Sequence, residues 1–265
     1  MEKYFDDVHA SKESQFYNLP TNIENSPVVA ELKSQISNSP HNYDLYLEIG
    51  KLLNFQLRYR ESIEFYSKAV ELNPEDIRGY RSRAPRYITT LQFNKAHANF
   101  LFCEEKSGTT LDTSYRIGLC YYFMRDYAKA KERFIACFEL SKNDFEMMAA
   151  VNYWYILCCV KLGETDITIP DLIPKGIAIH HHAGYSNVVS LFKNELTIPA
   201  LSENAKRYAE PMNAPIALYG LYNYYKYTKR FDEASELLKQ IIADDTYWIC
   251  FAYIGAWVDN CALAG

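Results

Sequence analysis

Aromatic and small residues return every 34 residues along the first half of the chain, and this period constrains the fold more than any other feature. It joins Tyr59 to Phe93 and Tyr127, Tyr66 to Phe100 and Phe134, and Ala69 to Cys103 and Cys137. Three consecutive units, 43–76, 77–110 and 111–144, align without a gap. A fixed period of about 20 to 50 residues is typical of proteins whose units pack only against their neighbours. The chain is therefore predicted to hold an array of stacked units.

Within each unit the apolar positions predict two helices joined by a short turn. In the first unit Tyr46, Ile49 and Leu53 are spaced to share one face of a helix, and Ile63 and Tyr66 begin a second apolar stripe. Gly and Pro number only 10 each, which disfavours a loop-rich all-β fold. An all-α fold built from helical hairpins follows.

These units resemble the tetratricopeptide repeat family, whose 34-residue motif has a large residue at position 4, Leu-Gly at 7–8, Tyr at 11, Ala at 20, an aromatic residue at 24, Ala at 27 and Pro at 32. The matching residues are Tyr46, Ile49, Gly50, Leu53, Ser62, Tyr66, Ala69 and Pro74, then Tyr80, Ala84, Tyr87, Ala96, Phe100 and Cys103, then Ile117, Gly118, Tyr121, Ala130, Phe134 and Cys137. The resemblance implies a right-handed superhelix of helical hairpins, an α-solenoid. It also implies that the first helices line a concave surface that binds partners.

The repeat pattern predicts four regions. These are an N-terminal extension over 1–25, the tetratricopeptide array over 26–162, an irregular helical insertion over 163–214, and a C-terminal repeat-like unit with a capping helix over 215–265. The 34-residue register is lost in the insertion, where prolines are frequent. The fold class is thus an α-solenoid interrupted by an irregular helical segment.

The segment from Tyr247 to Val258 carries no charge, so a helix there would be apolar nearly all round. Such a helix requires burial on more than one side. We expect it to be buried within the chain, under segment 163–214. The alternatives are a homodimer formed through this helix and a natural chain that continues beyond Gly265.

Composition limits the classes of partner. Lys and Arg number 28 against 33 Asp and Glu, a net charge of −5, which argues against nucleic acid as a general partner. The chain has no apolar run of about 18 residues and no export signal at its start, so we expect neither membrane insertion nor secretion. A cytoplasmic protein with reduced cysteines is the expectation, and no cofactor is predicted.

No catalytic motif is found, and His180, His181 and His182 are the only candidates for metal chemistry. Neutral imidazoles bind transition metals, but three adjacent rings cannot all reach one ion from a regular helix or strand. A polar loop with some half-buried rings is the favoured interpretation. The alternative is a small-molecule or catalytic pocket formed by the concave groove together with segment 163–214.

The concave groove is the favoured binding site. If positions 2, 5, 9 and 12 of each repeat face it, as the resemblance implies, its surface is aromatic with a basic centre. The candidate ligand-binding residues are Lys51, Asn54, Arg78, Arg81, Tyr115, Arg116, Tyr122 and Tyr153. Lys51, Arg78 and Arg81 favour a ligand with an acidic group. Many of the tyrosines are equally compatible with packing between helices.

One subtype of the family binds chaperone tails through Lys at position 5 and Asn at position 9 of its first repeat. Here these positions hold Leu47 and Lys51. Arg116 alone resembles a residue of that clamp, so chaperone-tail binding is not predicted. The leading hypothesis is a non-enzymatic scaffold whose groove binds a peptide or protein segment. A peptide-responsive regulator is a further alternative.

Overall fold

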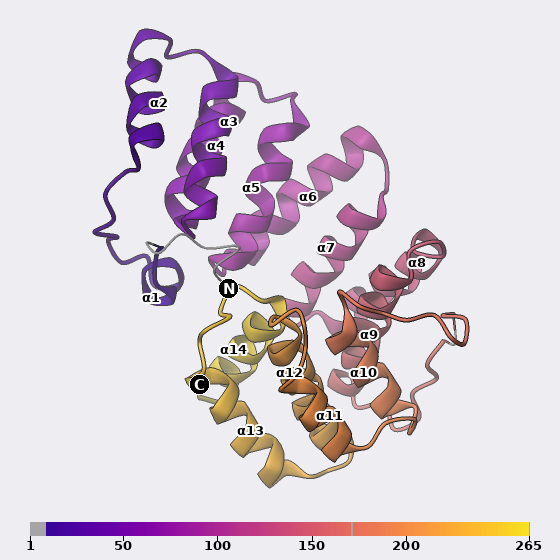
Figure 1. Ribbon diagram of the computed structural model, residues 1–265. Helices are drawn as coiled ribbons and strands as arrows, with labels where there is room; N and C mark the ends of the chain where they lie inside the picture. The colour runs from indigo at the N-terminus through magenta and orange to yellow at the C-terminus, as the bar shows by residue number, and fades with distance from the viewer. Residues whose placement is uncertain (1–8, 171, 265) are drawn as a thin grey trace. The chain divides into compact units, whose positions relative to one another are not determined.

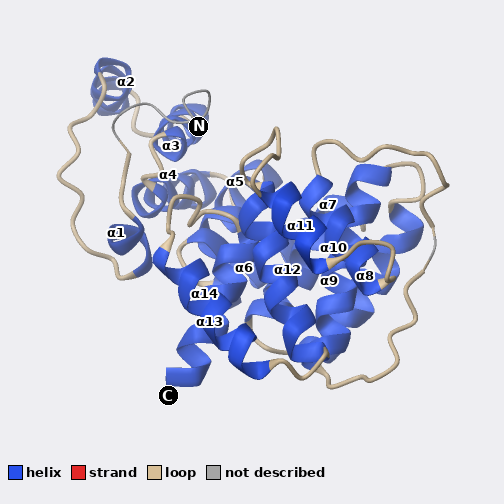
Figure 2. Cartoon of the chain, turned by 60° about the horizontal axis from the view of Figure 1, so that its bottom comes forward, coloured by secondary structure: helices blue, strands red, loops and turns tan. Residues whose placement is uncertain are grey.

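The computed structural model describes residues 9–170 and 172–264, and every regular element in these ranges is an α-helix (Figures 1 and 2). The chain divides between Thr109 and Thr110 into two compact units, called unit 1 and unit 2 below. Unit 1 contains α1 (Lys12–Phe16), α2 (Pro27–Asn38), α3 (Tyr43–Phe55), α4 (Tyr59–Leu72), α5 (Ile77–Thr89) and α6 (Phe93–Ser107). Unit 2 contains α7 (Leu111–Phe123), α8 (Tyr127–Leu140), α9 (Phe145–Lys161), α10 (Ala183–Phe192), α11 (Ile198–Ala205), α12 (Asn213–Tyr227), α13 (Phe231–Ala243) and α14 (Phe251–Ala264).

The predicted all-α fold of helical hairpins is confirmed. In unit 1, α3 packs against α4 and α5 against α6; in unit 2, α7 packs against α8 and α12 against α13. The division between the units falls inside the region predicted as one array. The four predicted regions, and the superhelix over 26–162 that joins both units, stay predictions.

The first helix of each repeat begins at a capping side chain, and these caps stand 34 residues apart. Asn42, Asp76, Thr110 and Asp144 precede α3, α5, α7 and α9, and each side chain accepts a hydrogen bond from a backbone N–H of the first turn. Such caps satisfy donors that a helix start otherwise leaves without partners. The period therefore fixes helix starts as well as apolar faces.

The turn inside each hairpin holds a non-glycine residue in the left-handed region, again at the 34-residue spacing. Leu57, Leu91 and Arg125 have φ of 55°, 60° and 66°. In the first turn the N–H of Arg58 bonds to the carbonyl of Leu53 at 3.0 Å. This is the 6→1 hydrogen bond that closes many helices, and it reverses the chain so that the second helix packs against the first.

Each unit has a core of its own. Val29, Leu32, Ile49 and Leu53 form a buried cluster in unit 1 where α2 packs on α3. In unit 2, α9 is buried along almost its whole length, because α8, α10 and α12 all pack against it. Six of the seven cysteines, Cys103 and Cys137 among them, are buried, and the described residues form no disulfide.

The apolar C-terminal segment is buried within unit 2. Its helix, α14, begins at Phe251, four residues later than predicted, and packs against α12, α13 and α7 rather than under segment 163–214. A Cβ on Gly255 would lie 2.8 Å from the Tyr219 ring, so glycine permits the close approach of α14 to α12. Burial within the chain agrees with the expectation, while the homodimer stays a prediction.

The long loop between α9 and α10 is anchored to the start of α9. The Glu146 carboxylate accepts hydrogen bonds from the backbone N–H groups of His180 at 2.7 Å and His182 at 2.8 Å. The ring Nδ1 of His182 also donates to the Glu146 carbonyl oxygen at 2.8 Å. The loop therefore returns to α9 before α10 begins (Figure 2). Among the described residues, no helix has both the length and the apolar character needed to cross a membrane.

Candidate binding groove

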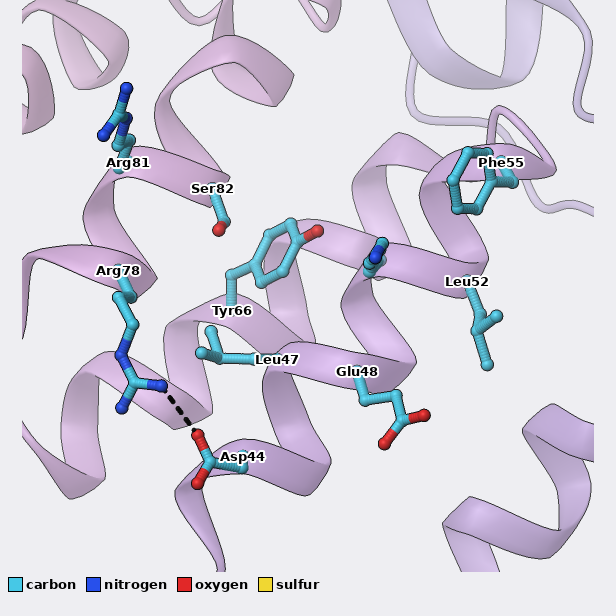
Figure 3. Close-up of a pocket in the computed structure, with 10 residues that line it drawn as sticks. Asp44, Leu47, Glu48, Leu52, Phe55, Tyr66, Arg78, Arg81 and Ser82 are labelled. Atoms are coloured by element: carbon cyan, nitrogen blue, oxygen red, sulfur yellow. Dashed lines mark hydrogen bonds and ion pairs between the residues drawn. The ribbon is translucent and has the colours of Figure 1, made fainter. Parts of the chain in front are cut away.

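Unit 1 contains a groove of about 610 Å³ between α3 and α5, with part of α4 at its base (Figure 3). Its lining residues are Asp44, Leu47, Glu48, Lys51, Leu52 and Phe55 from α3, Tyr66 from α4, and Arg78, Arg81 and Ser82 from α5. Three of the predicted ligand-binding residues, Lys51, Arg78 and Arg81, are brought together here.

The repeat register positions the polar residues at one end of the groove. Asp44 and Arg78 each follow their helix cap by two residues, so the two side chains meet across the groove. Arg78 Nη1 donates to Asp44 Oδ1 at 2.9 Å (Figure 3), and its Nη2 donates to Asp76 Oδ2 at 2.7 Å. Hydrogen bonds to Asp76 and, after it, to Asp44 raise the pKa of Arg78. The positive charge of Arg78 is thus already matched by two carboxylates.

Apolar side chains line the rest of the groove. Phe55 at the end of α3 is 53% exposed, and Leu47 and Leu52 are half-buried. Tyr66 is almost fully buried beneath them, with its ring close to Gly50. Exposed aromatic surface beside apolar neighbours favours contact with another apolar group.

The remaining charges of the groove are unevenly matched. Lys51 and Arg81 are exposed, and Glu48 is the exposed carboxylate that lines the groove besides Asp44. Within the part of the chain that the structure describes, Lys51 makes no ion pair. Arg81 lies beyond Ser82, away from Asp44 (Figure 3). The groove therefore holds two further cations, Lys51 and Arg81, beside an apolar surface.

Asn54 does not line the groove. Its side-chain oxygen accepts a hydrogen bond from Arg86 Nη1, and the Arg86 guanidinium lies 4.8 Å from the centroid of the Tyr59 ring. Asn54 therefore links α3 to α5 beside the groove.

The predicted site residues of unit 2 are packed inside it. Tyr122 is 2% exposed, and its hydroxyl hydrogen-bonds that of Tyr219 on α12 at 2.8 Å. The hydroxyl of Tyr153 donates to the Ile216 carbonyl at 2.9 Å. Tyr115 is also buried. Because α10, α12 and α14 pack on α7 or α9, these three tyrosines present no surface to a ligand, contrary to the expectation.

Arg116 is directed along its own helix. Its Nε donates to Asp112 Oδ1 at 2.7 Å, an i,i+4 ion pair on α7 that is partly exposed. Exposed pairs of this kind contribute about 0.3–0.5 kcal/mol of stability. Its predicted role in ligand binding stays a prediction.

His180, His181 and His182 lie in the loop held by Glu146. Among the described residues, no group of three or more His, Cys, Asp or Glu side chains is placed to hold a metal ion. Because backbone N–H groups of all three residues donate to the Glu146 carboxylate, the run helps to fix the loop. The catalytic or small-molecule alternative stays a prediction.

Sequence reasoning missed Glu48, Leu52, Phe55 and Ser82 as lining residues. Glu48, Phe55 and Ser82 each follow a predicted groove position by four residues, and side chains four apart are neighbours on a helix. Leu52 directly follows the predicted Lys51. A prediction that also included the helix positions next to those expected to face the groove would have found them. The apolar Phe55, at the last position of α3 where burial is least expected, was the available signal.

Comparison with known proteins identifies a known repeat in two segments of the chain. The family model described as "Tetratricopeptide repeat" matches residues 43–76 and 111–144, the first and third predicted units. The Hsp70-Hsp90 organizing protein of Triticum aestivum is 28% identical over 149 residues, which is 55% of this chain and 25% of that protein. Hsp70-Hsp90 organizing protein 3 of Arabidopsis thaliana is 24% identical over 195 residues, 72% of this chain and 34% of that protein.

Two further similarities cover other kinds of protein. The UDP-N-acetylglucosamine–peptide N-acetylglucosaminyltransferase of Giardia intestinalis is 24% identical over 143 residues, 54% of this chain and 8% of that protein. The crystal structure of YrrB, described as a TPR protein with an unusual peptide-binding site, has a TM-score of 0.46 and 16% identity, covering 84% of this chain and 96% of that one. The chain thus spans about a third or less of these curated relatives. Residues 43–76 and 111–144 thus match the tetratricopeptide repeat family, and the helical hairpins of the chain follow the same 34-residue register.

Proposed function

We propose that this protein is a non-enzymatic interaction scaffold that binds a peptide or protein segment in the groove between α3 and α5. One observation carries the proposal: the groove exposes Phe55 and Leu52 beside Lys51 and Arg81. Burying this exposed apolar surface against an apolar group of a partner would stabilise the complex by about 25 cal/mol per Å². The cations add a preference for charge.

The chemistry of the groove favours a segment that carries an apolar side chain and an acidic group. The apolar side chain would pack on Phe55 and Leu52, and the acidic group would approach Lys51 and Arg81. Arg78 is less suited to this role, since Asp44 and Asp76 already accept its hydrogen bonds. A further carboxylate there would meet two like charges.

The relatives support a role in protein interaction without naming this chain's partner. Two of them are named as organising Hsp70 and Hsp90. This chain has Leu47 and Lys51 where the chaperone-binding subtype has Lys and Asn, so we do not extend chaperone-tail binding to it. We propose a different segment, selected by the apolar surface as well as by charge.

Selection from a phage-displayed library of random peptides tests the proposal. We expect the protein to enrich sequences that combine an acidic and an apolar residue. A Lys51→Glu, Arg81→Glu variant should bind an enriched peptide at least about tenfold more weakly, since a charge-assisted hydrogen bond contributes about 1.5–3 kcal/mol. A Phe55→Ala variant should weaken binding at any salt concentration.

The matched control is Lys68→Glu, Lys106→Glu, which reverses the charge of two exposed lysines of unit 1 that do not line the groove. This control should bind the enriched peptides as the unmodified protein does. Equal binding by the groove variant would overturn the assignment. A loss seen only at low ionic strength would show long-range steering instead of contact.

A further inference from the structure

Unit 2 contains a second, smaller cavity, separate from the groove in unit 1, of about 190 Å³. Its lining residues are Arg125, Tyr127, Val160, Lys161, Tyr222, Lys226, Asp259, Ala262 and Leu263. Sites for drug-sized molecules usually measure about 300–1,000 Å³. This cavity therefore suits one small chemical group.

Three cations reach this cavity from three elements. Arg125 stands in the turn after α7, where its left-handed backbone closes the helix, Lys161 is the last residue of α9, and Lys226 lies in the last turn of α12. The lining holds a single carboxylate, Asp259 of α14. In the described part of the chain, neither Arg125 nor Lys226 forms an ion pair.

Asp259 is already engaged by its neighbours. It forms an ion pair with Lys161, and its Oδ2 accepts a hydrogen bond from the Tyr219 hydroxyl at 2.9 Å. Asp259 therefore neutralises Lys161 and leaves the charges of Arg125 and Lys226 without a carboxylate.

The pKa of Lys161 is lowered by its burial and by the two neighbouring cations. Its side chain is only 6% exposed. Burial lowers its pKa, Asp259 raises it, and the nearby charges of Lys226 and Arg125 lower it further. Like charges gathered around a buried lysine destabilise the charged form, and an anion would relieve this repulsion.

Tyr222 contributes a further polar group to the lining of this cavity. Tyr222 is 2% exposed, and its ring is in contact with Lys161 and Lys226 at 5.3 and 5.6 Å from its centroid. Its hydroxyl makes no hydrogen bond to the described residues and is not one of their buried atoms without a partner, so solvent reaches it. Because Tyr222 lines the cavity, this hydroxyl can donate a hydrogen bond to a bound group.

We propose that this cavity binds a single phosphate-type oxyanion through the charges of Arg125 and Lys226, with the Tyr222 hydroxyl as a further donor. Several acceptor oxygens on one small centre match donors that converge from different elements, and guanidinium and ammonium groups bind phosphate strongly. The anion is either free phosphate or a phosphate monoester of limited size.

Calorimetric titration at constant ionic strength tests this site with two probes, inorganic phosphate and N-acetyl-phosphoserine amide. Arg125→Gln and Lys226→Met should each weaken binding about tenfold or more, because each removes a charge-assisted hydrogen bond. Tyr222→Phe keeps the ring and should cause a smaller loss. Lys239→Met, which removes an exposed lysine of α13 outside the cavity, should change nothing.

Thermal unfolding and circular dichroism of each variant without phosphate show whether it is folded, so that lost binding is not mistaken for lost structure. Tighter binding of the phosphoserine probe would assign a monoester, and binding of inorganic phosphate alone would assign the free anion; both support the site. No saturable binding of either probe, or binding that the three cavity variants leave unchanged, would overturn it.

Discussion

Helices α3 and α7 hold the same register in their repeats, 68 residues apart, but their equivalent faces have opposite environments. In unit 1, Leu47 and Lys51 line an open groove. The corresponding Tyr115 and Leu119 of unit 2 are buried. The repeat motif therefore determines the hairpin, whereas the helices that pack on the hairpin determine whether its inner face is a binding surface.

The side chains at these positions carry the difference. Both faces carry an aspartate in the first turn, Asp44 on α3 and Asp112 on α7, but the charged Lys51 of α3 corresponds to the apolar Leu119 of α7. Burying a charge without a partner is costly, so only the second face can accept covering helices. In unit 2 α14 packs on α7, and α10 and α12 pack on α9.

The largest effect that tests this comparison is expected for Tyr153→Ala in unit 2. The side chain is fully buried, contacts Tyr185 edge-on at 4.9 Å, and bonds to the Ile216 carbonyl. We expect unfolding in urea to show a loss of about 3–5 kcal/mol, as for other large buried aromatic residues. The loss of the hydroxyl also leaves a buried carbonyl without its partner.

Phe55→Ala in unit 1 is the matched change on the open face. Because Phe55 is more than half exposed, its replacement should alter stability by no more than about 0.5 kcal/mol. Similar losses for the two variants would contradict the contrast between a covered and an open face.

The sequence predicted the hairpins well because their determinants are local. Caps such as Asn42 and Asp76, apolar stripes such as Tyr46–Leu53, and glycine opposite an aromatic residue all act within about 34 residues. The covered state of Tyr122 and Tyr153 could not be predicted in this way, since their partners Tyr219 and Ile216 lie 97 and 63 residues away.

The groove could be predicted only in part for a related reason. Lys51, Arg78 and Arg81 follow from the register, but the ion pairs that occupy Arg78 depend on the rotamers chosen by Asp44 and Asp76. A charge pattern on a helix face indicates solvent exposure. It does not show which charge remains available to a ligand.

We expect a smaller difference in stability between the variants Gly118→Ala and Gly50→Ala. A Cβ on Gly118 would lie 2.9 Å from the Phe134 ring, and one on Gly50 would lie 2.5 Å from the Tyr66 ring. Phe134 is fully buried, whereas Tyr66, although only 4% exposed, lines the groove. We expect Gly118→Ala to cost about 1–3 kcal/mol of stability, typical of overpacking, and Gly50→Ala to cost less.

Thermal or urea unfolding of the two variants measures this difference directly. Alanine is favoured over glycine inside helices by about 1 kcal/mol, and this gain applies to both sites. It therefore cancels in the comparison. A larger loss at Gly50 would show that the groove side of unit 1 is as tightly packed as the interior of unit 2.

The smallest expected effect concerns Glu146, which anchors the loop that leads into the covering helix α10. Burial raises the pKa of this carboxyl, but the N–H groups of His180, His182 and His181 lower it by more, so that the net shift is downward. A lowered carboxyl pKa stabilises the folded state above the ordinary value of about 4.3. That stabilisation is lost as the pH falls through the lower pKa of the folded protein.

We expect the backbone amide resonances of His180 and His182 to shift below about pH 4.3, with a midpoint under that value. At neutral pH, Glu146→Gln removes the negative charge and one of the acceptor oxygens, so trypsin should cleave the loop at Lys175 several times faster. The matched control is Glu139→Gln, which affects only the exposed ion pair between Glu139 of α8 and Lys142. If Glu146→Gln left the cleavage rate unchanged, the docking of α10 would have to depend on its own apolar contacts, such as that of Val188 with Gly220 of α12, and the covering of unit 2 would need no anchored loop.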